Sequence, residues 1–205
     1  MSTTDEARAV VAPAIADPAP LGLAAFALTT FLLSATNAGW MHAATGNAWL
    51  GYALAYGGLV QLLAGMWEFR NRNVFGATAF STYGGFWIGL GLWALLVAPH
   101  ATGLAGVKDL GWILLGFAIF NSYMLIISTQ VNWAVFGVFL TLELTEIFLF
   151  IGFFTTKTGT GGMIKVGGII GIITAAVAWY ASAAGVMNGH KGKVLFPVGK
   201  PLFDL

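Results

Sequence analysis

The chain has 205 residues, of which 58% are hydrophobic and only 8% are charged, whereas roughly 25% of the residues in an ordinary soluble domain are charged. This composition excludes a soluble globular fold, and a formal net charge of +1 without a long basic tract excludes an interface for nucleic acid. The absence of cysteine excludes disulfides, thiolate metal sites and a cysteine nucleophile.

The first predicted element is an N-terminal tail over residues 1–20. Two acids, Asp5 and Glu6, precede the first base, Arg8, and the tail lacks the basic start and continuous apolar core of a signal peptide. We therefore expect a retained, partly disordered cytoplasmic tail. Its alanine and proline content also allows a short interfacial helix.

Six apolar segments follow the tail, each about 20 residues long and separated by loops that carry Gly, Asn, His, Pro or charge. The segments are 21–41, 48–68, 75–98, 110–129, 131–154 and 163–186. None alternates in polarity as the strands of a β-barrel would. The sequence therefore predicts an all-α integral membrane protein, with a six-helix transmembrane domain over residues 21–187 and a cytoplasmic C-terminal tail over residues 188–205.

Basic residues and glycines predict how these helices are oriented and packed. Six crossings place both termini on one side of the membrane, and that side holds six of the nine bases: Arg8, Arg70, Arg72, Lys191, Lys193 and Lys200. Because cytoplasmic loops are enriched in Lys and Arg, we expect both termini in the cytoplasm and the protein in the cell (inner or plasma) membrane.

The 28 glycines predict a tight bundle, since small residues let helices in lipid approach closely.

The first segment carries a stripe of polar groups and a further hydroxyl, Thr29. The stripe consists of Phe26, Thr30, Leu33 and Asn37, whose i, i+4, i+7, i+11 spacing places them on one face of a helix. Such a face combines an aromatic ring with hydrogen-bonding groups, which is typical of a path for a small solute. Alternatively, the hydroxyls bond to carbonyl groups of their own helix at i−4.

The second segment has a similar stripe, formed by Gly58, Gln61, Gly65 and Glu68. Glu68 lies beside Arg70 and Arg72 at the predicted membrane edge, where a structural ion pair is favoured over a role at the entrance of a path. The third segment opens with residues 75–87, in which hydroxyls, aromatic rings and glycines are crowded and which include Thr82 and Tyr83. This stretch can line a narrow path.

Two carboxyl groups lie near the centre of the fifth segment. Glu143 and Glu146 are three residues apart, about 60° around the helix axis, and each would cost at least about 2.5 kcal/mol if charged and facing lipid. They must therefore face protein or water, where a low dielectric and a like neighbour favour the protonated form. Proton exchange and a static hydrogen bond across a helix or subunit interface both remain open.

Five motifs stand out along the chain: DPAPLGLAAF at 17–26, NAG at 37–39, YGGLVQ at 56–61, AFSTYGGFW at 79–87 and VLFPVG at 194–199. They resemble the motifs of the acetate uptake transporter family, whose bacterial members are called succinate-acetate permeases. The resemblance runs nearly from end to end, although the last three apolar segments match mainly as hydrophobic helices. Asp17 departs from the usual leading Asn of the first motif and adds a negative charge near the entrance.

The resemblance implies six-helix protomers assembled into a hexamer, with a separate pore in each protomer that passes acetate and, in some members, succinate. It also implies that Phe26 and Tyr83 belong to a hydrophobic constriction, with Leu142 as a third member. The pair Glu143 and Glu146 is a second departure from the resemblance, so different proton coupling is an open question.

The leading hypothesis is therefore a transporter or channel for acetate and other small carboxylates, with or without coupled protons. The expected path is lined by Phe26, Thr29, Thr30, Asn37, Gln61, Thr82, Tyr83 and Leu142. The alternative is a channel for a small neutral solute such as urea. An enzyme is disfavoured because His42, His100 and His190 lie in loops or beyond the last helix without metal-ligand spacing, and we expect neither a metal nor a cofactor.

Overall fold

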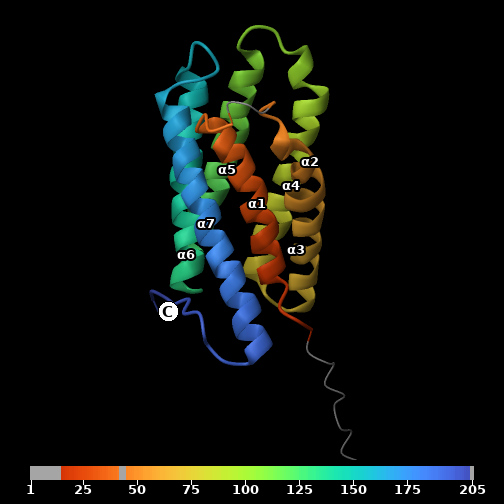
Figure 1. Ribbon diagram of the computed structural model, residues 1–205, viewed down its shortest axis with the longest axis vertical. Helices are drawn as coiled ribbons and strands as arrows, with labels where there is room; N and C mark the ends of the chain where they lie inside the picture. The colour runs from red at the N-terminus through yellow and green to blue at the C-terminus, as the bar shows by residue number, and fades with distance from the viewer. Residues whose placement is uncertain (1–14, 42–44, 204–205) are drawn as a thin grey trace, which may run out of the picture.

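The computed structural model describes residues 15–41 and 45–203, and over these residues the regular structure is helical (Figure 1). The helices are α1 Ala19–Asn37, α2 Ala48–Leu54, the π-helical segment η1 Ala55–Val60, α3 Gln61–Arg70, α4 Val74–Leu96, the short 3-10 turn η2 Ala98–His100, α5 Ala105–Ser128, α6 Trp133–Thr155 and α7 Gly162–Lys191. Most of the expected N-terminal tail, residues 1–14, and the loop residue His42 lie outside the described residues.

Within the described residues, six helical stretches are long and apolar enough to cross a membrane: Ala19–Asn37, Ala48–Arg70, Val74–His100, Ala105–Ser128, Trp133–Thr155 and Gly162–Lys191. The predicted all-α membrane fold with six crossings is confirmed. The second crossing is α2, η1 and α3 in continuous succession, and its π-helical turn contains the glycine pair Gly57 and Gly58. Such turns insert an extra residue into a helix and are frequent at functional sites.

The fourth crossing begins earlier than hydropathy predicts, at Ala105 rather than near residue 110, because Lys108 has partners there. Its Nζ donates to the carbonyl oxygens of Phe153 at 3.2 Å, Phe154 at 2.6 Å and Thr156 at 3.4 Å. These are carbonyls at the C-terminal end of α6, which lack partners within their own helix. A lysine at this position therefore joins α5 to α6 instead of marking a loop.

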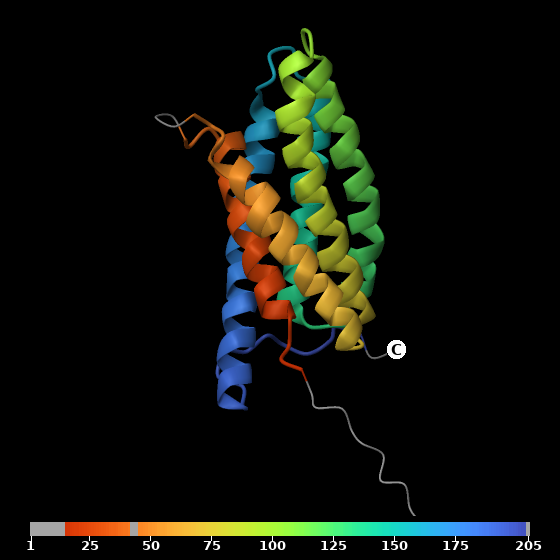
Figure 2. The same ribbon diagram turned by 90° about the vertical axis from the view of Figure 1, so that its right-hand side faces the viewer.

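The crossings follow a closed order around the bundle: α1, α7, α6, α5, α4 and then the α2–α3 crossing, which packs on both α4 and α1 (Figures 1 and 2). The backbones of α4 and α5 approach each other at few positions, and aromatic rings fill the space between the two helices. The ring centroids of Phe86 and Phe117 lie 4.5 Å apart, and those of Tyr83 and Phe120 lie 5.5 Å apart. The start of α1 and the end of α7 lie at the same end of the bundle, which we call the terminal end. The opposite end is called the far end.

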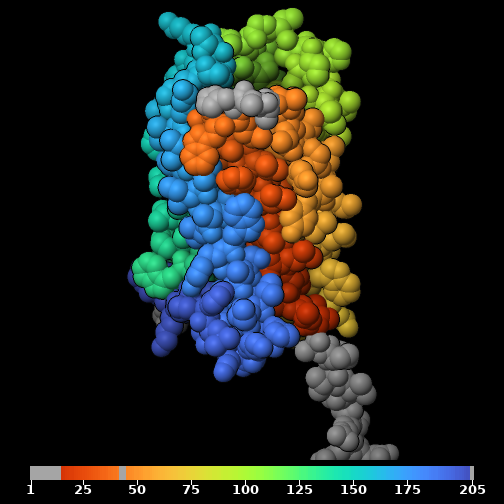
Figure 3. All heavy atoms as spheres, in the orientation of Figure 1, coloured from red at the N-terminus to blue at the C-terminus, as the bar shows by residue number. Residues whose placement is uncertain are grey.

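Helices α1 and α7 lie side by side over most of their length, with side chains filling the space between them (Figure 3). Gly168 on α7 makes this approach possible. A Cβ there would meet backbone atoms of α1, among them the carbonyl oxygen of Ser34 at 2.8 Å and the carbonyl carbon of Asn37 at 2.8 Å. Backbone cannot move aside as a flexible side chain can, so the glycine is required by packing.

Gly168→Ala is expected to lower the stability of the bundle by about 1–3 kcal/mol through overpacking against α1. Gly189→Ala is the matched control, because it lies on the same helix with nothing within 4 Å of its added Cβ. Thermal unfolding in detergent, followed by tryptophan fluorescence, measures the difference. Equal melting temperatures for the two variants would mean that α1 and α7 are not in this close contact.

Candidate functional site

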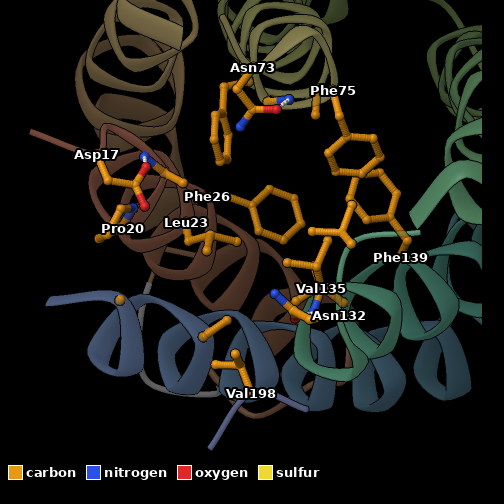
Figure 4. Close-up of a pocket in the computed structure, with 18 of the residues that line it drawn as sticks. Asp17, Pro20, Leu23, Phe26, Asn73, Phe75, Asn132, Val135, Phe139 and Val198 are labelled. Carbon is orange, nitrogen blue, oxygen red and sulfur yellow. Dashed lines mark hydrogen bonds between the residues drawn. The ribbon is translucent and has the colours of Figure 1, made fainter. Parts of the chain in front are cut away.

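A cavity of about 340 Å³ opens at the terminal end of the bundle (Figure 4). Its lining comes from α1, the start of α3, the α3–α4 and α5–α6 loops, α4, α6, the end of α7 and the C-terminal tail. We call this cavity the vestibule. In Figure 4 the ring of Phe26 lies in the middle of the labelled lining residues, with Leu23 and Pro20 before it on the same helix.

The polar rim of the vestibule is built from helix caps. Asn73 Oδ1 accepts from the backbone nitrogen of Gly76 at 3.0 Å at the start of α4, and Asn132 Oδ1 accepts from Val135 at 2.9 Å at the start of α6. Each cap satisfies one of the free amide groups of its helix and fixes its own side chain. Asp17 does the same for α1, where its Oδ1 accepts from the backbone nitrogen of Ala19 at 2.9 Å.

The C-terminal tail closes one side of the vestibule. Asn188 at the end of α7 accepts from the backbone nitrogens of Leu195 at 2.8 Å and Phe196 at 3.0 Å, and its Nδ2 donates to the carbonyl of Phe196 at 2.8 Å. Further on, the carbonyl of Val198 accepts from Ala134 at 3.0 Å. Residues 194–202, called the strap below, therefore cross from α7 to the α5–α6 loop.

A second cavity of about 40 Å³ lies toward the far end and is called the inner cavity. Its lining residues are Phe26, Thr30, Leu33, Ser34, Asn37, Tyr83, Phe86, Trp87, Leu114, Leu142, Thr145, Glu146 and Leu149. The four members of the stripe in the first segment, Phe26, Thr30, Leu33 and Asn37, all lie along it. The helical spacing thus predicts correctly that they share one face.

Three side chains line both cavities: Phe26 from α1, Tyr83 from α4 and Leu142 from α6. All three are buried, and the rings of Phe26 and Tyr83 pack edge to face with their centroids 5.8 Å apart. Tyr83 also packs against Phe117 and Phe120 of α5. The vestibule and the inner cavity therefore meet at one apolar ring, called the Phe26–Tyr83–Leu142 ring.

Behind this ring, the hydroxyl of Tyr83 joins a buried polar network. Tyr83 Oη lies 2.9 Å from Asn121 Oδ1 and 3.3 Å from Glu146 Oε1. Asn121 Nδ2 donates to Glu143 Oε2 at 2.7 Å, and Ser122 Oγ donates to Glu143 Oε1 at 2.9 Å. The network thus runs from the inner cavity between α4 and α6 to the exposed Ser122 on α5.

Three polar atoms of residues that line the inner cavity are buried without a hydrogen-bond partner in the part of the chain that the structure describes: Thr30 Oγ1, Trp87 Nε1 and Glu146 Oε2. Thr30 differs in this respect from Thr29, whose Oγ1 donates to the carbonyl of Ala25 at 3.1 Å. The alternative in which a hydroxyl bonds to the carbonyl group four residues earlier in its own helix therefore applies to Thr29 and not to Thr30. Buried polar atoms without partners are rare and costly, so these three mark a place where a ligand or water can bind.

The expected path residues are distributed unevenly over the two cavities. Six of them line one or both: Phe26, Thr30, Asn37, Gln61, Tyr83 and Leu142. Thr29 and Thr82 lie outside both cavities. Of the two glutamates, Glu146 lines the inner cavity, whereas Glu143 is half-buried behind Asn121.

The ion pair expected for Glu68 is wrong for the residues that the structure describes. Glu68 is fully buried, and its Oε2 accepts from Asn71 Nδ2 at 3.0 Å. Arg70 and Arg72 are exposed at the end of the crossing, where they can stay in water. The physical reason is that the Glu68 side chain points into the bundle, where it lies against Gly76, whereas Arg70 and Arg72 point away from the bundle.

Two important residues, Asn121 and Trp87, were not singled out from the sequence. Asn121 is fully buried at the centre of the polar network. A lone asparagine in the middle of an apolar crossing is itself a signal, because an amide in lipid needs a partner. Trp87 is the last residue of the stretch 75–87 that was expected to line a path, but nothing in the sequence distinguishes it from its neighbours, and only its position on the inner cavity does so.

The fold and the site define a multi-pass membrane protein with two largely apolar cavities, each with a few polar groups, that meet at an apolar ring between its crossings. The chain belongs to the GPR1/FUN34/yaaH family, whose profile matches residues 2–200. This confirms the resemblance seen in the sequence motifs.

Relatives of the chain include transport proteins. It is 39% identical to "Acetate permease A" of Emericella nidulans, over 93% of this chain and 68% of the relative, and 34% identical to "Succinate-acetate/proton symporter SatP" of Escherichia coli, over 91% of this chain and 96% of the relative. A solved structure described as "Structure of the bacterial acetate channel SatP" matches with a TM-score of 0.81 and 33% identity, over 90% of this chain and 99% of that chain. These relatives are transporters or channels and not enzymes.

Proposed function

We propose that the chain transports acetate and other small carboxylates across the cell membrane along the vestibule, the Phe26–Tyr83–Leu142 ring and the inner cavity. The observation that carries the proposal is that these three side chains, and no others among the lining residues, line both cavities. A solute that passes between the cavities must pass this ring. The names of the relatives support acetate and succinate as the substrate class.

The ring acts as a dry constriction. A short apolar ring excludes hydrated ions because they would have to shed their water, whereas a small acid with an apolar methyl group sheds little. The residues that line the two cavities include no Lys, Arg or His. Recognition then rests on hydroxyl and amide groups, and we expect weak binding in the millimolar range, about −4 kcal/mol.

The experiment is flux of labelled acetate into liposomes that contain the purified protein, with protein-free liposomes as the background. We expect saturable uptake that propionate inhibits and that urea does not. Inhibition by urea with no inhibition by propionate would instead support the channel for a small neutral amide. No uptake above the background would contradict both readings.

The protein is proposed to assemble as a hexamer with one path in each protomer. Its α4 helix carries two glycines one turn apart, Gly85 and Gly89, that are exposed and have open space where a Cβ would be. Such a surface lets a helix of a neighbouring protomer approach closely. Native mass spectrometry in mild detergent is expected to show a hexamer, and a spectrum of monomers alone would contradict the proposal.

Both termini are proposed to lie in the cytoplasm. The terminal end carries Arg70, Arg72, Lys191, Lys193 and Lys200 among the described residues, which fits the excess of basic residues on the cytoplasmic side. Because the chain has no cysteine, single cysteines report orientation directly. We expect a membrane-impermeant maleimide to label Thr158→Cys, at the far end, in intact cells, and to label the exposed Val194→Cys only after lysis. The reverse pattern would invert the topology.

A further inference from the structure

The amide of Asn121 determines which atoms of the polar network carry protons. Its Nδ2 donates to the carbonyl oxygen of Phe139 at 3.0 Å and to Glu143 Oε2 at 2.7 Å. A backbone carbonyl can only accept, so the amide cannot be turned around without losing this bond. Asn121 Oδ1 therefore faces Tyr83 and accepts its single hydroxyl proton.

This arrangement leaves Glu146 to supply the proton for its own contact with Tyr83. Tyr83 Oη lies 3.3 Å from Glu146 Oε1, and its only proton is already donated to Asn121, so the hydrogen between the two oxygens comes from Glu146. Glu143, in contrast, receives hydrogen bonds from Asn121 and Ser122, as a carboxylate does. The network is satisfied with Glu146 as the acid and with its Oε2 free as an acceptor.

The inner cavity then presents a defined set of polar groups. Glu146 Oε2 is an acceptor, Trp87 Nε1–H is a donor only, and the hydroxyl of Thr30 can both donate and accept. None of these three atoms has a hydrogen-bond partner among residues 15–41 and 45–203. All three residues are at most 4% exposed. The cavity volume of about 40 Å³ holds about three water molecules, the size of a molecule with two carbons and two oxygens.

An anion would be poorly placed in this cavity. The titratable groups that face Glu146 are Glu143 from the same helix and Tyr83 from α4, and Tyr123 from α5 lies near Tyr83. Helices α1 and α7 contribute only the non-titrating groups Thr30, Ser34, Asn37 and Thr174 on this side. An acetate ion would thus lie near a carboxylate without a cation, at a high cost in a low dielectric.

We propose that the inner cavity binds a small carboxylic acid in its undissociated form. The O–H of the acid donates to Glu146 Oε2, and its carbonyl oxygen accepts from Trp87 Nε1 and the Thr30 hydroxyl. Its alkyl group lies against the leucines of the cavity. The inference rests on the proposed transport function. It means that the proton crosses the membrane as part of the substrate, so that each transfer moves no net charge. The O–H bond of the acid stays intact in the cavity, and no covalent bond is made or broken there.

Three molecules of nearly equal shape test the hydrogen-bond pattern. Acetamide has both a donor and an acceptor, as undissociated acetic acid does, whereas acetone has only the acceptor. Acetamide is expected to inhibit labelled acetate uptake into liposomes, and acetone is not. Uptake at several pH values should follow the concentration of the undissociated acid after subtraction of the protein-free background, and it should not change with a potassium diffusion potential set by valinomycin.

Two pairs of variants test the residues. Trp87→Phe removes the donor and should raise the KM for acetic acid about threefold to tenfold, which is the usual effect of one hydrogen bond. Trp93→Phe on the same helix is its control and should leave the KM unchanged, because Trp93 lines neither cavity and its Nε1 lies 3.5 Å from Asp109. Glu146→Leu removes both the acceptor for the substrate and the donor for Tyr83, so it should raise the KM. Glu146→Gln keeps both groups and should raise the KM less than Glu146→Leu does.

The outcomes separate this inference from the proposed function. Absence of protein-dependent acetate uptake in the wild type overturns the proposed function. Uptake that depends on the membrane potential, follows the total acetate concentration across pH, or is unaffected by both Trp87→Phe and Glu146→Leu overturns the inference and leaves the function standing. Melting temperatures of the variants show whether a raised KM reflects a lost contact or a damaged fold.

Discussion

Phe26→Ala is expected to relax the size selection of the transporter. Truncation opens the Phe26–Tyr83–Leu142 ring on the α1 side, so that larger acids such as lactate pass more readily relative to acetate. A hydrophobic pocket discriminates by roughly tenfold for each methylene group, and we expect a change of that order in the ratio of lactate to acetate flux. The measurement is uptake of both labelled acids by liposomes, and Tyr83→Ala should act in the same direction.

Phe31→Ala provides the control for the size prediction. Phe31 lies on the same helix and packs against Trp179, with a ring-centroid distance of 5.5 Å, but it lines neither cavity. Its truncation should leave the flux ratio as in the wild type. If Phe26→Ala and Tyr83→Ala both assemble normally and retain the wild-type ratio, the ring does not select substrates by size.

Asn121→Leu is expected to cause the largest loss of stability, about 2–4 kcal/mol. The substitution leaves Tyr83 Oη, the Phe139 carbonyl and Glu143 Oε2 without their partner in the bundle interior. A buried polar group that loses its partner costs about 1–3 kcal/mol, and a charged one costs more. The melting temperature in detergent and the fraction of protein that stays monodisperse measure the effect.

Ser122→Ala separates the buried part of the network from its exposed end. Ser122 is exposed and gives Glu143 a single hydrogen bond that water can replace. We expect a change in stability within about 0.5 kcal/mol, as for surface substitutions generally. A loss as large as that of Asn121→Leu would mean that the network depends on its exposed end rather than on Asn121.

Most of the fold could be predicted from the sequence, because apolar length and helical period are local properties. The six crossings appear where hydropathy places them, and the residues of the first stripe share a cavity. The prediction failed where a charged residue had a partner far away in the chain. The bounds that hydropathy predicts, 75–98 and 110–129, leave Lys108 in a loop, whereas it donates to carbonyl groups of α6 about 45 residues later in the chain.

The site could be predicted only in part, for a similar reason. The resemblance to the family predicts that Phe26 and Tyr83 lie in one constriction, and the structure shows that their rings are in contact. It cannot tell that Thr29 bonds to its own helix while Thr30 does not, since the two hydroxyls are chemically identical and differ only in the face that they occupy. The pairing of Glu143 with Asn121 likewise depends on the register between α5 and α6, which no local pattern encodes.

The strap also has a consequence for the biosynthesis of the protein. Its hydrogen bonds go to Asn188, to Ala134 and, through Leu202, to the carbonyl of Thr129, all of which precede it in the chain. The strap can therefore close only after its own residues have left the ribosome, when all the helices that it contacts have already been synthesised. Until then the side-chain amide of Asn188, the backbone nitrogen of Ala134 and the carbonyl oxygen of Thr129 lack these partners. Closure of the strap thus follows synthesis of the six crossings, and a reagent or protease that recognises the open strap would distinguish chains before and after closure.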